Sequence, residues 1–223
     1  MFILNTSPAI GQKKPLGQFG TARIKKNIRY SLFANCEYLF ANPEYAGYNH
    51  PMKPQDIIVM LKIFLWKNGR WSIDAIASSI DLSNSETHAA IKRSGKAGVF
   101  DALTERPRRA ALEEFIIHGV KYAFPAEIGA KVRGLPTAHS APPLSSLIVS
   151  NKEDVLVWPT PEGKVQGLNV SPLYPCVPVA AKNDPKLYQF LALIDALRIG
   201  RPREQKCAID EIIKRLRAPN EIE

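Results

Sequence analysis

Long apolar runs and paired cysteines are both missing from this chain of 223 residues. The longest apolar stretch, Ile57 to Trp66, is interrupted by Lys62 and falls short of the roughly 18 apolar residues that a membrane-spanning helix needs. Its three cysteines, Cys36, Cys176 and Cys207, lie far apart, which excludes a CxxC zinc element and a dense disulfide framework. The sequence therefore predicts a protein without a membrane span. Because the first twenty residues do not have the pattern of an export signal, we expect it in the cytoplasm.

Motifs for catalysis and cofactor binding are also missing. The four histidines do not recur at metal-ligand spacing, and neither GxGxxG nor GxxxxGK(S/T) occurs. The adjacent carboxylates Glu153 and Asp154 lie among polar residues of a turn, where solvation is the simplest interpretation. We therefore expect no enzyme activity, no metal and no cofactor.

Basic residues outnumber acidic ones. The chain has 30 Lys and Arg against 21 Asp and Glu, so its formal net charge is +9. This excess favours a polyanionic partner, and nucleic acid is the first class to consider for a chain without an export signal. A merely solvated basic surface is the alternative.

The pattern of residues divides the chain into three segments. Residues 1–51 combine scattered Gly, Pro and Asn with clustered cations, which predicts a weakly ordered basic extension, and Met52 is an alternative start. Residues 52–120 have repeated helical spacing and form the predicted DNA-binding domain. Residues 121–217 begin with loops and short strands and end in two amphipathic helices that form a hairpin. The predicted strands lie in the runs Val120–Phe124, Leu147–Val149 and Val155–Trp158.

Local signals place three helices in the second segment. Pro54 suits the first turn of a helix that stops at Asn68-Gly69, and Ser72 suits the N-cap of a short second helix. Next comes a capping box, in which the Ser83 hydroxyl accepts from the amide of Glu86 and the Glu86 carboxylate reaches back. The tight turn between the second and third helices predicts a helix-turn-helix.

A fourth helix follows a short extended segment. The third helix stops near Gly95 or Gly98, and Pro107 is expected to open the fourth. The fold class predicted from these elements is α+β and mostly helical, with a winged helix-turn-helix domain and a small mixed accessory domain that ends in a helical hairpin.

The third helix carries the candidate DNA contacts. In a helix-turn-helix, the recognition helix lies in the major groove, where polar side chains read base edges and cations bind phosphates. Basic residues continue beyond this helix, with six cations against two acids between Lys92 and Arg109. An ordinary solvated helix face is the alternative. The predicted DNA-binding residues are Ser83, Asn84, Ser85, His88, Ala89, Lys92, Arg93, Lys96, Arg106, Arg108 and Arg109.

The run from Leu82 to Arg93, followed by Ala97-Gly98-Val99-Phe100, resembles the recognition helix of MarR-type winged helix-turn-helix regulators. The loose pattern of that family is L-S-x-S-E-V-H-x-A-L-x-R with a later A-G-L, and Thr87 stands where it prefers Val. A usual wing has two strands and a basic turn, whereas Asp101 to Pro107 leaves room for a stub. The resemblance covers about residues 53–120. Residues 121–217 are similar to the remaining part of MarR-like regulators without a known effector, some of which are antitoxins or controllers of defence genes.

These features predict a sequence-specific DNA-binding transcriptional regulator. We expect a homodimer on double-stranded DNA with a two-fold operator, because one recognition helix reads only a few base pairs. The alternative is an antitoxin or interaction module that binds the protein product of a neighbouring gene and uses DNA binding for autoregulation. The operator sequence, the effector and the sign of regulation stay open.

A loop in the third segment is a second candidate site. Arg133, Thr137, His139 and Ser140 could bind an anion or a partner peptide, with Trp158 as an aromatic wall. The alternative is an exposed loop that its prolines hold against the short strands. For the C-terminal helices, the sequence leaves open whether their apolar faces cover the winged domain or a second subunit.

Overall fold

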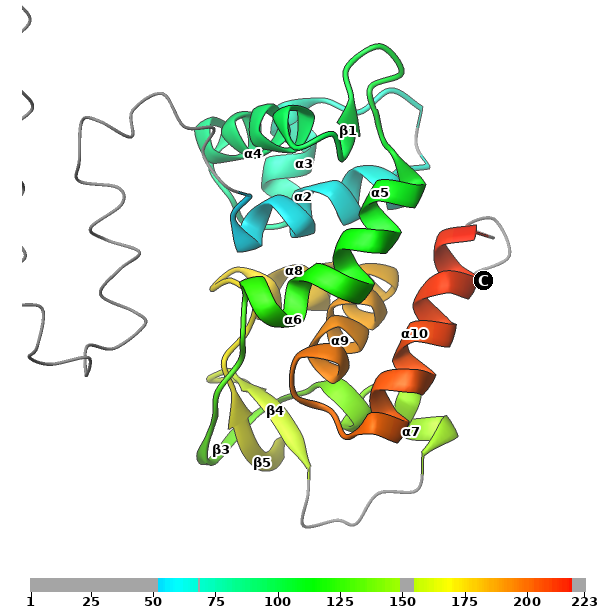
Figure 1. The fold of residues 1–223 in the computed structure, drawn as a ribbon. Coiled ribbons are helices and arrows are strands. Elements are labelled where there is room, and N and C mark those ends of the chain that lie inside the picture. The colour runs from blue at the N-terminus through cyan, green and yellow to red at the C-terminus, as the bar shows by residue number, and fades with distance from the viewer. Residues whose placement is uncertain (1–51, 68, 149–154, 218–223) are drawn as a thin grey trace, which may run out of the picture. The chain divides into compact units, whose positions relative to one another are not determined.

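The structure is a computed structural model that describes residues 52–67, 69–148 and 155–217. The predicted basic extension, residues 1–51, lies outside the described residues. The described residues belong to one compact unit, and this unit is α+β and mostly helical, as predicted (Figure 1). Within the described ranges, no helix combines the length and the apolar character needed to cross a membrane.

Three helices open this unit: α2 (Pro54–Leu65), α3 (Ile73–Ser79) and α4 (Asn84–Lys96). The predicted starts are confirmed, because Pro54 occupies the first turn of α2 and the Ser72 hydroxyl accepts from the amide of Ala75 at 3.1 Å. After α4, Gly98 has a φ of 76°, a left-handed conformation that glycine adopts without steric cost. Both α2 and α3 pack against α4 (Figure 1).

A short hairpin follows α4. Strand β1 (Phe100–Asp101) pairs antiparallel with β2 (Arg106–Pro107), which confirms the predicted stub. The prediction that Pro107 opens the next helix is wrong, because Pro107 belongs to β2. The following amide, that of Arg108, still donates to the carbonyl of Val99 at 2.7 Å, so helical bonding begins only at Arg109.

One helical run connects the hairpin to the C-terminal half: α5 (Arg109–Glu114), a π-helical turn (Phe115–Gly119) and α6 (Val120–Ala123). The predicted strand at Val120–Phe124 is therefore wrong. The amide of Phe124 donates to the carbonyl of Val120 at 2.8 Å, so local helical bonding continues through these β-prone residues. The predicted boundary between residues 120 and 121 falls inside this run.

Three strands form a small closed sheet: β3 (Ile128–Pro136), β4 (Leu156–Pro159) and β5 (Val165–Val170). Strand β3 pairs antiparallel with both others, and β4 and β5 pair in parallel. The Val155–Trp158 run correctly predicts β4, whereas the sequence predicts loops for β3 and β5. In the run Leu147–Val149, Leu147 ends a short helix, α7 (Leu144–Leu147), and Val149 lies outside the described residues.

Three helices complete the described chain: α8 (Val177–Asn183), α9 (Pro185–Ile199) and α10 (Pro202–Arg217). The C-terminal hairpin is confirmed, because α9 and α10 pack together, and Asp184 caps α9 by accepting from the amide of Leu187 at 3.1 Å. Helix α8 is missing from the sequence prediction. Within the chain, α9 packs against α2 and α10 packs against α5.

The hydrophobic core is continuous from α2 to α10. Phe64 of α2 meets Phe190 of α9 edge to face, with ring centroids 6.3 Å apart. The same two helices are also joined by an ion pair, because Lys62 Nζ of α2 lies 2.7 Å from the Asp184 carboxylate that caps α9. The helices that carry the candidate DNA contacts therefore share one core with the C-terminal half.

Candidate nucleic-acid interface

The N-terminus of α4 confirms one half of the predicted capping box. The Ser83 hydroxyl accepts from the amide of Glu86 at 3.1 Å. The Glu86 carboxylate, however, accepts from Gln55 Nε2 at 2.9 Å and from Arg93 Nη2 at 2.5 Å. The predicted reach back to the cap is wrong, because a guanidinium two turns further along holds this carboxylate more strongly than a neutral amide does.

Helix α4 has a buried face and an exposed face. Thr87, Ala90 and Ser94 are buried against the other helices, as the spacing predicts. Around the rest of the helix, the predicted DNA-binding residues are exposed except for Ala89 and Arg93, which are half-buried. The exposed ones on α4 and its cap are Ser83, Asn84, Ser85, His88, Lys92 and Lys96. Asn84 is exposed but engaged, because its Nδ2 donates to Asp74 Oδ1 at 3.2 Å.

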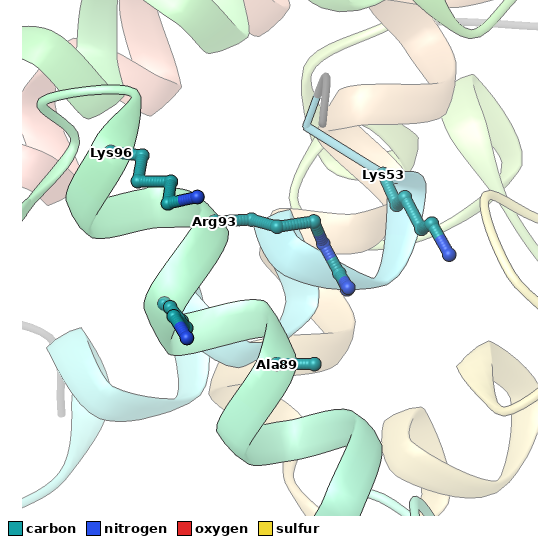
Figure 2. Close-up of a pocket in the computed structure, with 5 residues that line it drawn as sticks. Lys53, Ala89, Arg93 and Lys96 are labelled. Atoms are coloured by element: carbon teal, nitrogen blue, oxygen red, sulfur yellow. The ribbon is translucent and has the colours of Figure 1, made fainter. Parts of the chain in front are cut away.

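A cationic hollow lies where the later turns of α4 face the start of α2. It has a volume of about 460 Å³ and is lined by Lys53, Ala89, Lys92, Arg93 and Lys96 (Figure 2). None of the described acidic side chains lines it. Such a surface attracts polyanions, because cations close together raise the local positive potential.

Arg93 does not have the free position that the sequence predicts for a phosphate contact. Its Nε lies 2.9 Å from Asp56 Oδ2, and its Nη2 lies 2.6 Å from Asp56 Oδ1 and 2.5 Å from Glu86 Oε1. Figure 2 shows the Arg93 side chain extending from α4 toward α2. Asp56 is fully buried in α2, so the guanidinium supplies the partner that a buried carboxylate requires.

The titration behaviour of the Arg93 cluster, which consists of Arg93, Asp56, Glu86 and Gln55, agrees with this geometry. The hydrogen bonds to Asp56 raise the pKa of Arg93 above its ordinary value. Burial by itself would raise the pKa of Glu86, but the hydrogen bonds from Arg93 and Gln55 outweigh burial and lower that pKa. Arg93 and Glu86 are therefore both charged at neutral pH.

Sequence reasoning missed Lys53, which completes the cationic hollow from the side of α2. The sequence did contain a signal that Asp56 pairs with a cation. Asp56 is an acid within the apolar-rich sequence of α2, and a buried acid needs a cation nearby. The sequence does not say which cation, since Arg93 is 37 residues away.

The three predicted DNA-binding arginines that follow α4, namely Arg106, Arg108 and Arg109, have different surroundings. Arg106 Nη1 donates to the carbonyls of Ile63 and Trp66 at the end of α2, at 3.1 and 3.2 Å. Arg109 lies over the ring of Phe64, with its guanidinium carbon 5.8 Å from the ring centroid. Arg108 is exposed. Arg106 therefore caps α2, because a cation at a helix C-terminus stabilises its free carbonyls.

The second candidate site does not have the form that the sequence predicts. Arg133 is exposed on β3, but the wall is wrong, because Trp158 is fully buried and its Nε1 donates to Asp195 Oδ2 at 2.5 Å. Thr137 is also buried and donates to the same oxygen at 2.9 Å. His139 is buried too, and the Ser140 hydroxyl accepts from the amide of Leu156 at 3.0 Å. Thr137, Ser140 and Trp158 therefore make hydrogen bonds within the protein and do not form a binding loop.

Comparisons with protein-family models, curated proteins and solved structures found nothing that matches this chain. The resemblance to MarR-type regulators therefore stays a prediction. Among the described residues, no group of three or more His, Cys, Asp or Glu side chains is placed to hold a metal ion. The geometry of α4 and of the cationic hollow is the basis for a functional proposal.

Proposed function

We propose that the protein is a sequence-specific DNA-binding transcriptional regulator that acts as a dimer. The observation that carries this proposal is the face of α4 opposite its buried residues. There Ser85 and His88 are exposed near the start of the helix, and Lys92 and Lys96 line the cationic hollow further along. Polar groups near the start of the helix suit base edges, and cations further along suit phosphates.

The arrangement of elements supports the same proposal. Helices α2, α3 and α4 followed by the β1–β2 hairpin give the order of elements in a winged helix-turn-helix. At the hairpin tip, Leu103 is 96% exposed and its amide donates to Asp101 Oδ1 at 3.0 Å. We assign most of the binding to α4, because the hairpin is short and carries the acids Asp101 and Glu105 near its tip.

DNA binding is expected to weaken steeply with salt. A fluorescently labelled duplex from the region upstream of the gene is titrated with the full chain at several salt concentrations, next to an unrelated duplex. If the three lysines of the cationic hollow each neutralise one phosphate, they contribute about −2.7 to the slope of log affinity against log salt. We expect two chains per upstream duplex. Absent binding at low salt, or binding independent of salt, would contradict the proposal.

Base recognition is expected to depend on Ser85 and His88. Replacing either with Ala should weaken binding to the preferred duplex by about 1–3 kcal/mol for each lost base contact. The unrelated duplex should bind almost as before, because its affinity comes from phosphates. Ser145→Ala, at an exposed serine of α7, is the matched control. Equal losses on both duplexes would show that these side chains do not read sequence.

A further inference from the structure

The Arg93 cluster joins the two walls of the cationic hollow. Arg93 reaches from α4 to the buried Asp56 of α2, and Gln55, the neighbour of Asp56, donates to Glu86 on α4 at 2.9 Å. Two side chains of α2 therefore bind two side chains of α4. Side chains of this cluster set how closely the later turns of α4 approach the start of α2.

Asp56 also fixes the position of Lys53. The backbone amide of Lys53 donates to Asp56 Oδ2 at 2.9 Å, and Arg93 Nε donates to the same oxygen at 2.9 Å. The Lys53 side chain is exposed and lines the cationic hollow opposite α4 (Figure 2). The Asp56 carboxylate thus binds the backbone of Lys53 on the α2 side of the hollow and the guanidinium of Arg93 on the α4 side.

Arg93 differs from the three lysines of the hollow in its ion pairs. Arg93 is paired with two carboxylates, and its side chain is only 11% exposed. Among the described residues, no acidic side chain forms an ion pair with Lys53, Lys92 or Lys96. Moving Arg93 to a phosphate would leave the fully buried Asp56 without its cation, which costs more than a surface contact returns.

We propose that Lys53, Lys92 and Lys96 bind the phosphates of one DNA strand across the gap between α2 and α4, and that Arg93 is a positioning residue. This inference rests on the proposed function and names how it is carried out. Lys53 supplies a contact from outside the recognition helix, so the strand is held from both sides. Arg93 keeps the two sides at the distance that this binding needs.

The salt dependence of DNA binding separates a contact from a positioning residue. Lys53→Gln should weaken binding about 5-fold at 0.15 M salt and make the slope of log affinity against log salt shallower by about 0.9, because one phosphate contact is lost. Arg93→Gln should weaken binding without a shallower slope, since Arg93 itself contacts no phosphate and all three lysines remain. Arg93→Lys should restore part of the affinity, because Lys pairs with Asp56 but not in the bidentate manner of Arg.

Controls keep the outcomes distinct. Lys131→Gln removes an exposed lysine of β3 and should leave both affinity and slope close to those of the unmodified chain. A slope unchanged by Lys53→Gln, or shallower by about 0.9 with Arg93→Gln, would overturn the inference. If Arg93→Gln does not fold, Glu86→Gln is measured in its place. An unchanged slope for Glu86→Gln supports the inference. A slope steeper by about 0.9 would overturn the inference, because it would show that Arg93 had moved to a phosphate. An unmodified chain without salt-dependent binding contradicts the proposed function itself.

Discussion

Asp195→Ala is expected to lower the free energy of unfolding by about 3–5 kcal/mol, because it leaves a buried guanidinium without its carboxylate. Asp195 is 1% exposed in α9, and its Oδ1 lies 2.6 Å from Arg198 Nη1. Burial raises its pKa, although Arg198, Thr137 and Trp158 all stabilise the charged form. Removing this carboxylate breaks every one of these bonds at once.

Through Arg198, the loss of Asp195 is expected to destabilise segments outside α9. Its Nε donates to the carbonyl of Phe124 at 2.7 Å, and its Nη1 donates to the carbonyl of Ser171 at 3.1 Å. The ion pair therefore connects α9 to the segment before β3 and to the one after β5. Loss of Asp195 should loosen both connections.

Denaturant unfolding monitored by circular dichroism measures this effect. Asp210→Ala, at an exposed acid of α10, is the matched control and should change stability by less than about 0.5 kcal/mol. Adding Arg198→Met to Asp195→Ala should cost less than the sum of the two single changes, because the second removes the unpaired charge. A loss for Asp195→Ala as small as that of the control would contradict the role given to this network.

Helices α2, α3, α4 and α9 could be predicted from sequence because their signals are local. Pro54, Ser72, Ser83 and Asp184 each mark the start of a helix within a few residues, and the spacing of apolar residues indicates which face of the helix is buried. The Asp195 network could not be predicted in this way. Its partner Thr137 lies 58 residues away, and no periodicity connects residues so distant.

The closed sheet shows the same limit. Strand β3 contains glycine and ends in proline, so the sequence predicts a loop there. Gly134 is required by packing, because a Cβ at this position would clash with the carbonyl oxygen of Trp158 on β4. The absence of a side chain lets the two strands approach, which only the tertiary structure shows.

For the candidate interface, the exposed face of α4 follows from helical spacing alone. Its mechanism does not, because Arg93 is paired within the protein and Lys53, which the sequence analysis missed, lines the hollow. The sequence groups Arg93 with Lys92 as a phosphate contact, whereas the structure pairs it with Asp56 of α2. The additional cation that lines the hollow, Lys53, lies at the start of α2.

Reversing the charge of both hollow lysines on α4 should nearly abolish DNA binding. Lys92→Glu with Lys96→Glu removes two phosphate contacts, which alone weakens binding about 30-fold at 0.15 M salt. The new carboxylates would also lie where phosphates are expected, and like charges repel there. Both positions are exposed, so the fold should stay intact in circular dichroism.

The most direct test compares this variant with one of equal charge elsewhere. Lys206→Glu with Lys214→Glu changes two exposed lysines of α10 and lowers the net charge by the same amount. In an anisotropy titration of the upstream duplex at 0.15 M salt, we expect the α4 variant to lose at least about 30-fold in affinity and the α10 variant to lose only a few-fold. Equal losses for the two folded variants would show that net charge, and not the exposed face of α4, determines binding.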